Sequence, residues 1–171
     1  MELDKDIKLL CESLVQEHLD SIPYKIEYVE APVRYLGKCV YKKDYFLLKF
    51  PILTFNKLKE LGQEDEIKDT VLHEIAHAIT TQKYGKKHGH DIYWQLTAKG
   101  IGCNGNRTAD TDLTLYKYVY ECPKCHKRVY KLRSYNHHVS CGKCSPHKYK
   151  RELELNLVET YKEVQFKFTL R

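Results

Sequence analysis

Three residues in segment 71–77 have types and spacing suited to metal chemistry. The segment reads Val-Leu-His-Glu-Ile-Ala-His, which places His73, Glu74 and His77 in an HExxH pattern. Positions four apart lie on one face of an α-helix, so both imidazoles can bind one metal ion, with Glu74 beside them as a general base. HExxH alone also arises by chance, but its variable positions here are apolar and further ligand residues follow. The pattern therefore predicts a catalytic zinc site of the metalloprotease type.

The third ligand of this site is not fixed by the same pattern. A catalytic zinc usually takes three protein ligands and keeps one position open. The HExxHxxGxxH arrangement fails, because Thr80 and Lys83 stand where its glycine and third histidine would be. No glutamate lies between Glu74 and Glu121. The residues that remain open, histidines first, are His88, His90, Asp91, Asp110 and Asp112.

A second metal site is predicted by two CxxC pairs that fifteen residues separate. Four thiolates in two such pairs match a tetrahedral structural zinc, held by Cys122, Cys125, Cys141 and Cys144. Residues 122–126 also fit the CxxCH haem attachment motif, but haem would leave the second pair without a role. A redox pair is a further alternative, but no thioredoxin-type pattern accompanies it. Reserve ligands would be His126, His137, His138 and His147.

The elements that position these residues follow from periodicity and turn signals. The HExxH helix is expected over 64–84, with acidic residues in its first turn and Gly85 after its end. Other helices are predicted at 5–19, 56–61 and 91–99, and strands at 24–30, 33–41 and 44–50. Cys11 is expected to be a small buried apolar residue, and Cys39 and Cys103 to be free thiols. The fold class is α+β.

The C-terminal part predicts a ribbon and a tail. Strands at 115–121 and 128–132 would flank the first CxxC pair, and two alternating stretches in 151–171 predict two more strands. The domain organisation is then a core over 1–112, a zinc ribbon over 113–150, and a β tail over 151–171 that packs on the ribbon or the core.

Composition excludes several protein classes. The chain has 171 residues with seven cysteines, an odd number that argues against a disulfide framework. No apolar run of 18 residues is present, so no membrane partner is expected. The acidic, amphipathic N-terminus lacks the features of a secretory signal. A monomer inside the cell is expected, in the cytoplasm, nucleoid or nucleus.

Positive charge is concentrated in one segment. Residues 116–151 contain ten basic residues and one acidic residue, a net charge of +9, which four thiolates and one Zn²⁺ would lower to about +7. Bases of single-stranded DNA can stack on the tyrosines of this segment while cations follow the phosphates. The alternative is a solvated ribbon whose tyrosines form its small core. Candidate DNA contacts are Lys124, Lys127, Arg128, Lys131, Arg133, Tyr118 and Tyr130.

The pattern HExxH followed by Gly89-His90-Asp91-x-x-Trp94 resembles the SprT-like (Spartan) metallopeptidases. In that family the histidine of the later motif is the third zinc ligand, so the resemblance selects His90 over His88 and makes Trp94 a packing residue. It implies a zincin-like protease core with a small antiparallel sheet, followed by a zinc ribbon. The resemblance covers about residues 5–150.

The resemblance also implies a function. Family members are zinc endopeptidases, and DNA activates them to digest proteins crosslinked to DNA. No ubiquitin- or clamp-binding tail follows the ribbon, so a minimal microbial or viral member is expected, a viral one acting inside the host cell. A substrate peptide is expected along an exposed strand edge at 44–50.

Three alternatives stay open. One is a nucleic-acid-binding ribbon protein with a dormant protease fold. Another is a regulatory metalloprotease that cuts one repressor-like partner. The third is a zinc hydrolase with a substrate other than protein.

Overall fold

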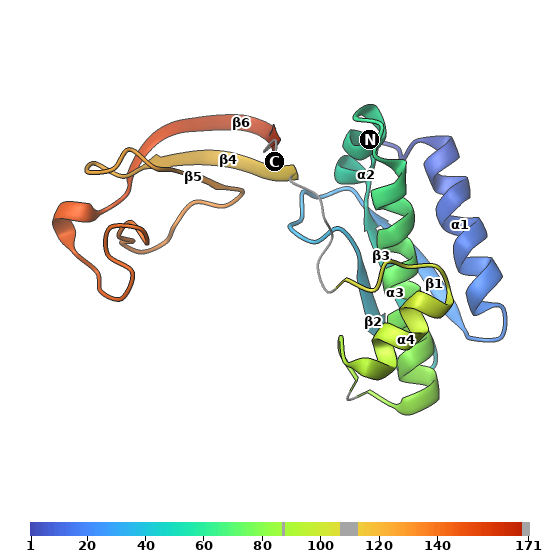
Figure 1. Cartoon of the computed structure of the whole chain (residues 1–171). Helices are drawn as coiled ribbons and strands as arrows, with labels where there is room; N and C mark the ends of the chain where they lie inside the picture. The colour runs from blue at the N-terminus through green and yellow to red at the C-terminus, as the bar shows by residue number, and fades with distance from the viewer. Residues whose placement is uncertain (87, 107–112, 169–171) are drawn as a thin grey trace. The chain divides into compact units, whose positions relative to one another are not determined.

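The structure, a computed structural model, describes residues 1–86, 88–106 and 113–168 (Figure 1). The chain forms two compact units, Met1–Thr111 and Asp112–Arg171. Each unit has one three-stranded sheet among its described residues. Two of the open third-ligand candidates, Asp110 and Asp112, lie outside the described residues.

The first unit combines helices with one small sheet, which confirms the α+β class. Its sheet has the order β1-β3-β2, with β1 parallel and β2 antiparallel to the central strand β3. The expectation of an antiparallel sheet is therefore wrong. After β1 the chain crosses to the far edge of the sheet, and only then does β2 form a hairpin with β3. The elements are α1 (Lys5–Leu19), β1 (Tyr24–Val29), β2 (Lys38–Tyr41), β3 (Phe46–Pro51), α2 (Ile52–Glu60), α3 (Glu64–Tyr84) and α4 (Ile92–Gly100).

The central strand β3 has one buried face and one partly exposed face. Phe46, Leu48 and Phe50 are buried, as the alternation in the sequence predicts. On the other face, Lys49 lies opposite Glu27 of β1, and the Lys49 Nζ is 2.8 Å from the Glu27 carboxylate. The core of this unit therefore lies on the side of the sheet that the helices cover.

Helix α3 is the central helix of the unit and has the bounds that the sequence predicts. It contacts α1, α2, α4 and strands β2 and β3 (Figure 1). Its buried apolar residues include Ile67, Val71 and Ile75, and Gly85 ends it with a φ of 95°. Because it is held on several sides, α3 is a rigid support for the histidines that it carries.

Three elements differ in length from their sequence-based expectations. Strand β2 is only Lys38–Tyr41, because the stretch before it runs outside the sheet. Helix α2 starts earlier than expected, directly after Pro51, and buries Ile52, Phe55 and Leu58. Helix α4 begins at Ile92, because the Asp91 side chain accepts a hydrogen bond from the backbone N–H of Trp94 at 3.2 Å.

The second unit is a three-stranded sheet with the order β5-β4-β6. Its elements are β4 (Leu113–Glu121), β5 (Arg128–Lys131), a 3₁₀ turn at Arg151–Leu153, and β6 (Asn156–Phe168). The prediction of two strands in the tail is wrong, because β6 is one long strand antiparallel to β4. Register shifts between Tyr116 and Tyr118 and between Val119 and Tyr120 let the two alternating stretches join.

No helix among the described residues is both long enough and apolar enough to cross a membrane. Cys11 lies fully buried in α1, as expected for a small apolar residue. None of the seven cysteines, Cys39 and Cys103 included, forms a disulfide in the described residues.

The two faces of β3 lead to a stability prediction. Leu48→Ala removes a fully buried side chain from the core, so the free energy of unfolding of the first unit should fall by about 2–5 kcal/mol. Leu47→Ala is the matched control, because Leu47 is only partly buried and points to the opposite face. Chemical denaturation monitored by circular dichroism would measure both. Equal losses would contradict the assignment of the core to the Leu48 face.

Candidate metal centres

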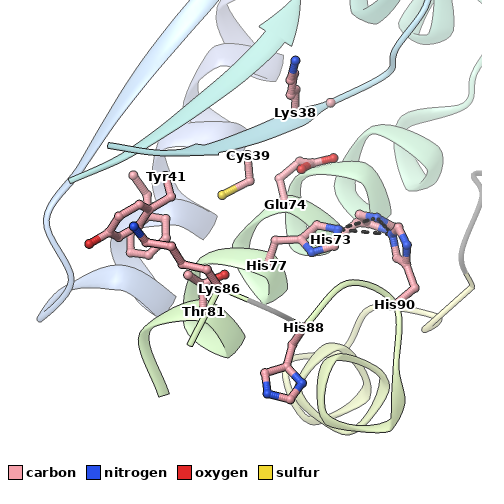
Figure 2. A pocket seen from close by; sticks show the side chains of 12 residues that line it. Lys38, Cys39, Tyr41, His73, Glu74, His77, Thr81, Lys86, His88 and His90 are labelled. Atoms are coloured by element: carbon pink, nitrogen blue, oxygen red, sulfur yellow. Dashed lines mark hydrogen bonds between the residues drawn. The ribbon is translucent and has the colours of Figure 1, made fainter. Parts of the chain in front are cut away.

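Three imidazoles from two elements converge in the first unit. The Nε2 atom of His73 lies 2.9 Å from that of His90 and 3.3 Å from that of His77 (Figure 2). The Nε2 atoms of His77 and His90 are 3.2 Å apart. With Zn–N bonds of about 2.0–2.1 Å, the edges of a tetrahedron of nitrogen ligands are about 3.3 Å long. The three nitrogens therefore lie close to the positions that one tetrahedral zinc ion requires, and a fourth position is left for water or substrate.

Helix α3 and the loop before α4 position these three rings. His73 and His77 lie one turn apart on α3, and His90 comes directly before the Asp91 cap of α4. Trp94 packs against all three rings and is fully buried, with ring centroids 4.6 Å from His73, 5.3 Å from His77 and 4.6 Å from His90. The expected packing role of Trp94 is thus confirmed, and the indole limits the rotation of the imidazoles.

His88 points away from this group. Figure 2 shows its ring apart from the other three imidazoles. Its Nδ1 atom lies 2.6 Å from the Asp91 carboxylate, and its ring packs against Tyr84 and Tyr93. Asp91 is occupied by this contact and by its capping role. Among the described candidates, His90 is therefore the residue that joins His73 and His77 in a potential metal-binding group.

Burial keeps the two helix histidines neutral. It lowers the pKa of His73 to about 4 and that of His77 to about 3, and repulsion from the neighbouring imidazoles adds to the effect. A hydrogen bond to the Asn106 backbone and the charge of Asp69 oppose the shift at His73. Neutral imidazoles are the form that binds a metal, and the Asn106 contact fixes the His73 ring in the manner of an outer-shell partner.

Glu74 lies beside the histidines in a buried position. Only 7% of the residue is exposed, and desolvation raises the pKa of its carboxyl to about 7. A hydrogen bond from the Cys39 backbone N–H opposes this shift. A divalent cation nearby would also favour the ionised form. The carboxyl group is therefore in an environment where it can both accept and release a proton near neutral pH.

The histidines and Glu74 line one side of a cleft of about 470 Å³ (Figure 2). Its opposite wall is the edge strand β2 with the preceding Gly37. Lys86 extends over the Tyr41 ring at 3.9 Å and joins the loop after α3 to this edge. The prediction that 44–50 is the exposed edge is wrong, because β3 is the central strand and only β1 and β2 are edge strands.

Comparison with known proteins agrees with this geometry. The model of the SprT-like family matches residues 13–114, which include the whole three-histidine group. The chain belongs to the SprT-like family. This result confirms the resemblance that the two sequence motifs indicate.

Curated relatives of this SprT-like chain include the bacterial proteins named SprT. The protein of Pseudomonas putida is 31% identical over 109 residues, which cover 54% of this chain and 64% of the relative. That of Pseudomonas fluorescens is 36% identical over 80 residues, or 42% of this chain and 48% of the relative. The chain thus aligns with about half to two thirds of the length of these relatives.

The second unit of the SprT-like chain contains a four-cysteine cluster. The Sγ atoms of Cys122 and Cys144 are 3.9 Å apart, and those of Cys125 and Cys141 are 3.7 Å apart. A tetrahedral zinc with bonds of about 2.3 Å needs sulfur separations of about 3.8 Å. All four sulfurs lie within 4.8 Å of one another, so they could hold one metal ion.

The thiols of this cluster cannot all ionise without a cation. Backbone N–H groups, above all that of Cys144, lower the pKa of the Cys141 thiol to about 6. The Cys144 thiol shows the opposite shift, because sharing hydrogen bonds with Cys125 raises its pKa to about 12. A dication would remove this conflict by stabilising every thiolate. Four sulfur ligands complete the tetrahedron, so such a site is closed and structural.

Three of the four histidines named as reserve ligands have other contacts. His126 lies 3.2 Å from the Glu121 carboxylate, and its φ of 54° belongs to the turn after the first CxxC pair. His138 lies 2.5 Å from the Glu154 carboxylate, and His137 contacts the Asn136 side chain. Within the described part of the chain, the group that could hold a metal contains four cysteines and no reserve histidine.

Four of the seven candidate DNA contacts interact with other residues of the protein, and three are exposed side chains. Arg128 is paired with Glu121 at 3.1 Å and Glu159 at 2.9 Å, and Tyr118 packs on the cysteine cluster. The Lys131 ammonium lies 4.7 Å from the Tyr135 ring, and the Tyr130 ring is covered by Lys167 at 3.9 Å. The remaining three are exposed side chains of the ribbon, Lys124, Lys127 and Arg133.

Three features of the site were missed by sequence reasoning. These are the Asn106 contact to His73, the Cys39 N–H contact to Glu74 and the contact of Lys86 with Tyr41. Each joins residues that are far apart in sequence, and two of the contacts use backbone atoms that every residue has. No motif or spacing in the sequence indicates such contacts.

The geometry predicts which later histidine matters for metal binding. His90→Ala should weaken zinc binding at the three-histidine site by more than about 100-fold, since even outer-shell partners contribute about 10–100-fold. His88→Ala is the matched control and should cost less than about tenfold, because His88 contacts Asp91 instead of the other rings. Zinc titration with a competing chelator would measure both. Equal affinities would remove His90 from the ligand set.

The two clusters predict two zinc ions per chain. Cys122→Ser should lower the zinc content from two to one and unfold the second unit, because a structural zinc supplies folding free energy. The control variant Cys103→Ser, which lies in the first unit, should keep two zinc ions per chain. Elemental analysis of the purified protein would measure the content. A wild-type protein with one zinc, and none in Cys122→Ser, would show that the three histidines bind no zinc.

Proposed function

We propose that this SprT-like protein is a zinc-dependent endopeptidase with a zincin-like core, and that it acts on proteins bound or crosslinked to DNA. One observation carries the proposal: three imidazoles converge on one point beside the buried carboxyl of Glu74, in an open cleft. This set leaves one coordination position free, as catalytic zinc sites do. Membership of the SprT-like family supports the same function.

The residues around the cleft have separate roles in peptide hydrolysis. His73, His77 and His90 would hold the zinc. Zinc, when bound, polarises a carbonyl group and lowers the pKa of water towards about 7. Glu74 takes the proton of the attacking water and then gives it to the leaving amine, which suits a carboxyl whose burial raises its pKa to about 7.

The substrate would lie along strand β2. This strand is the edge of the sheet on the side of the cleft, and Lys38, Cys39 and Tyr41 line the cleft with the histidines. An extended peptide that adds to this edge gains backbone hydrogen bonds, which recognise any sequence. Such binding supports a broad peptide specificity.

DNA association is supported by the charge of the ribbon. Residues 116–151 contain ten basic residues and one acidic residue. Lys124, Lys127 and Arg133 are exposed, so phosphates can reach them. Tyr149 is an exposed aromatic residue of the same segment and could stack with a base of a single strand. Substrate choice would then depend on proximity to DNA instead of sequence.

A regulatory protease with one protein target is the second candidate. The cleft gives it no separate support, but it uses the same zinc site. A dormant protease fold is disfavoured by the buried, intact Glu74. The two remaining candidates differ in substrate breadth, which an assay can measure.

The proposal predicts protease activity that depends on Glu74 and on DNA. The wild-type protein should cut a DNA-binding protein faster when single-stranded DNA is present. Glu74→Gln should keep two zinc ions per chain and lose at least about 100-fold in rate, because an amide cannot accept the proton. Cleavage followed on gels, with zinc analysis of each protein, would measure this.

Charge reversal of Lys124 and Lys127 together should abolish the stimulation by DNA and leave the DNA-free rate unchanged. The matched control reverses Lys5 and Lys8, which are exposed on α1. Cleavage by Glu74→Gln at the wild-type rate would exclude the proposed mechanism. Cleavage of a single protein with no effect of DNA would favour the regulatory protease.

A further inference from the structure

The backbone before strand β2 lies unusually close to Glu74. An ideal Cβ atom built on Gly37 would lie 2.7 Å from Glu74 Cγ, 3.0 Å from Glu74 Oε1 and 2.9 Å from Thr70 Cγ2. Carbon atoms in contact normally lie about 3.5–4.0 Å apart. No side chain therefore fits at position 37 while Glu74 and Thr70 keep their places.

Space, not backbone conformation, is what requires glycine here. The described glycines with positive φ are Gly62, Gly85, Gly102 and Gly105, and Gly37 is not among them. An alanine could adopt the backbone conformation of Gly37 without strain. Its Cβ atom would, however, clash with the side chains of Thr70 and Glu74 on α3.

Neither neighbour can easily move aside. Thr70 is 5% exposed and β-branched, so its rotamer is restricted. Glu74 Cγ is next to Cβ, so moving it requires a change of χ1 in a residue that is 7% exposed. A Cβ at position 37 would therefore displace either the carboxyl group or the segment itself.

The same segment also holds the carboxyl group directly. Two residues after Gly37, the backbone N–H of Cys39 donates a hydrogen bond to Glu74. This bond needs the segment to approach α3, and Gly37 is the residue that permits the approach. The Cys39 side chain contributes a thiol that burial keeps protonated by raising its pKa to about 12. The backbone of Cys39, not its thiol, is thus the part that contacts the base.

We infer that Gly37 and the Cys39 backbone N–H are positioning elements for the Glu74 carboxyl group, which they hold at a fixed place beside the three histidines. The inference rests on the proposed function, because it assigns Glu74 the role of base. It adds two residues that lie outside both zinc-binding motifs. Gly37 has no side chain and so lets the segment approach Glu74. Cys39 contributes its backbone N–H as a hydrogen-bond donor.

The test compares Gly37→Ala with Gly100→Ala. Gly100 is also a glycine of the first unit without positive φ, and a Cβ atom built on it would meet no other atom within 4 Å. Gly37→Ala should lower kcat by about 100-fold with KM and zinc content unchanged, because misplacement of a catalytic group by about 1 Å has an effect of this size. Gly100→Ala should keep the wild-type kcat.

A second readout does not depend on activity. Hydrogen exchange of the Cys39 amide in the metal-free protein should be slow in the wild type and in Gly100→Ala. It should become at least about tenfold faster in Gly37→Ala, because the hydrogen bond to Glu74 is lost. Glu74→Ala should accelerate exchange of the same amide without any change at position 37. Unchanged exchange in both variants would overturn the inference.

Failure of Gly37→Ala to fold would also be informative. Glu74→Ala removes Cγ and Oε1, the two Glu74 atoms that the new Cβ would meet. Adding Thr70→Ser removes Cγ2, the third atom that the new Cβ would meet. The triple variant Gly37→Ala, Thr70→Ser, Glu74→Ala should therefore fold and bind two zinc ions, and a triple variant that stays unfolded would overturn the inference. Full kcat in Gly37→Ala, with Glu74→Gln inactive, would overturn it while leaving the proposed function intact. An active Glu74→Gln would instead remove the proposed function.

Discussion

The convergence of three imidazole nitrogens at one point is the constraint on which the first unit depends. Nitrogens 2.9–3.3 Å apart repel one another when protonated, so the rings must be neutral and held in place. Helix α3 supplies two rings, and packing on several sides keeps it rigid. Trp94 packs against all three rings and also belongs to the helix that follows His90. The sheet, the helices and the indole together fix a geometry that no single element could hold.

Burial shifts the pKa values of the histidines and of Glu74 in opposite directions. It lowers the pKa of His73 to about 4 and raises that of Glu74 to about 7, because in both cases the charged form loses water. The result is two neutral imidazoles, those of His73 and His77, beside a carboxyl group whose pKa lies near neutral pH. Desolvation thus favours both the neutral imidazoles and the protonatable carboxyl group. Burial does not fix the position of the carboxyl group, and the segment that contains Gly37 and Cys39 adds this constraint.

The two candidate metal centres differ in their donor atoms and in their access to solvent. The three-histidine group opens into a cleft, and its ligands are only partly buried. In the ribbon, four sulfurs fill the tetrahedron, and Tyr120 and Leu155 pack around Cys122 and Cys141. A small sheet such as β5-β4-β6 has little core of its own, so the metal would supply much of its stability. Glu159 of β6 reduces the available positive charge by pairing with Arg128.

The sequence by itself predicted the candidate ligand types, the long helix α3 and the alternation of buried and exposed residues in β3, because these depend on local spacing and periodicity. It also grouped the four cysteines correctly in space, since two CxxC turns leave few other arrangements. Only the tertiary structure decided that β3 is central, that β2 forms the wall of the cleft, and that the tail is one strand. It also brought Gly37 against Glu74. Contacts of this kind join backbone atoms across long separations, and such atoms carry no signature in the sequence.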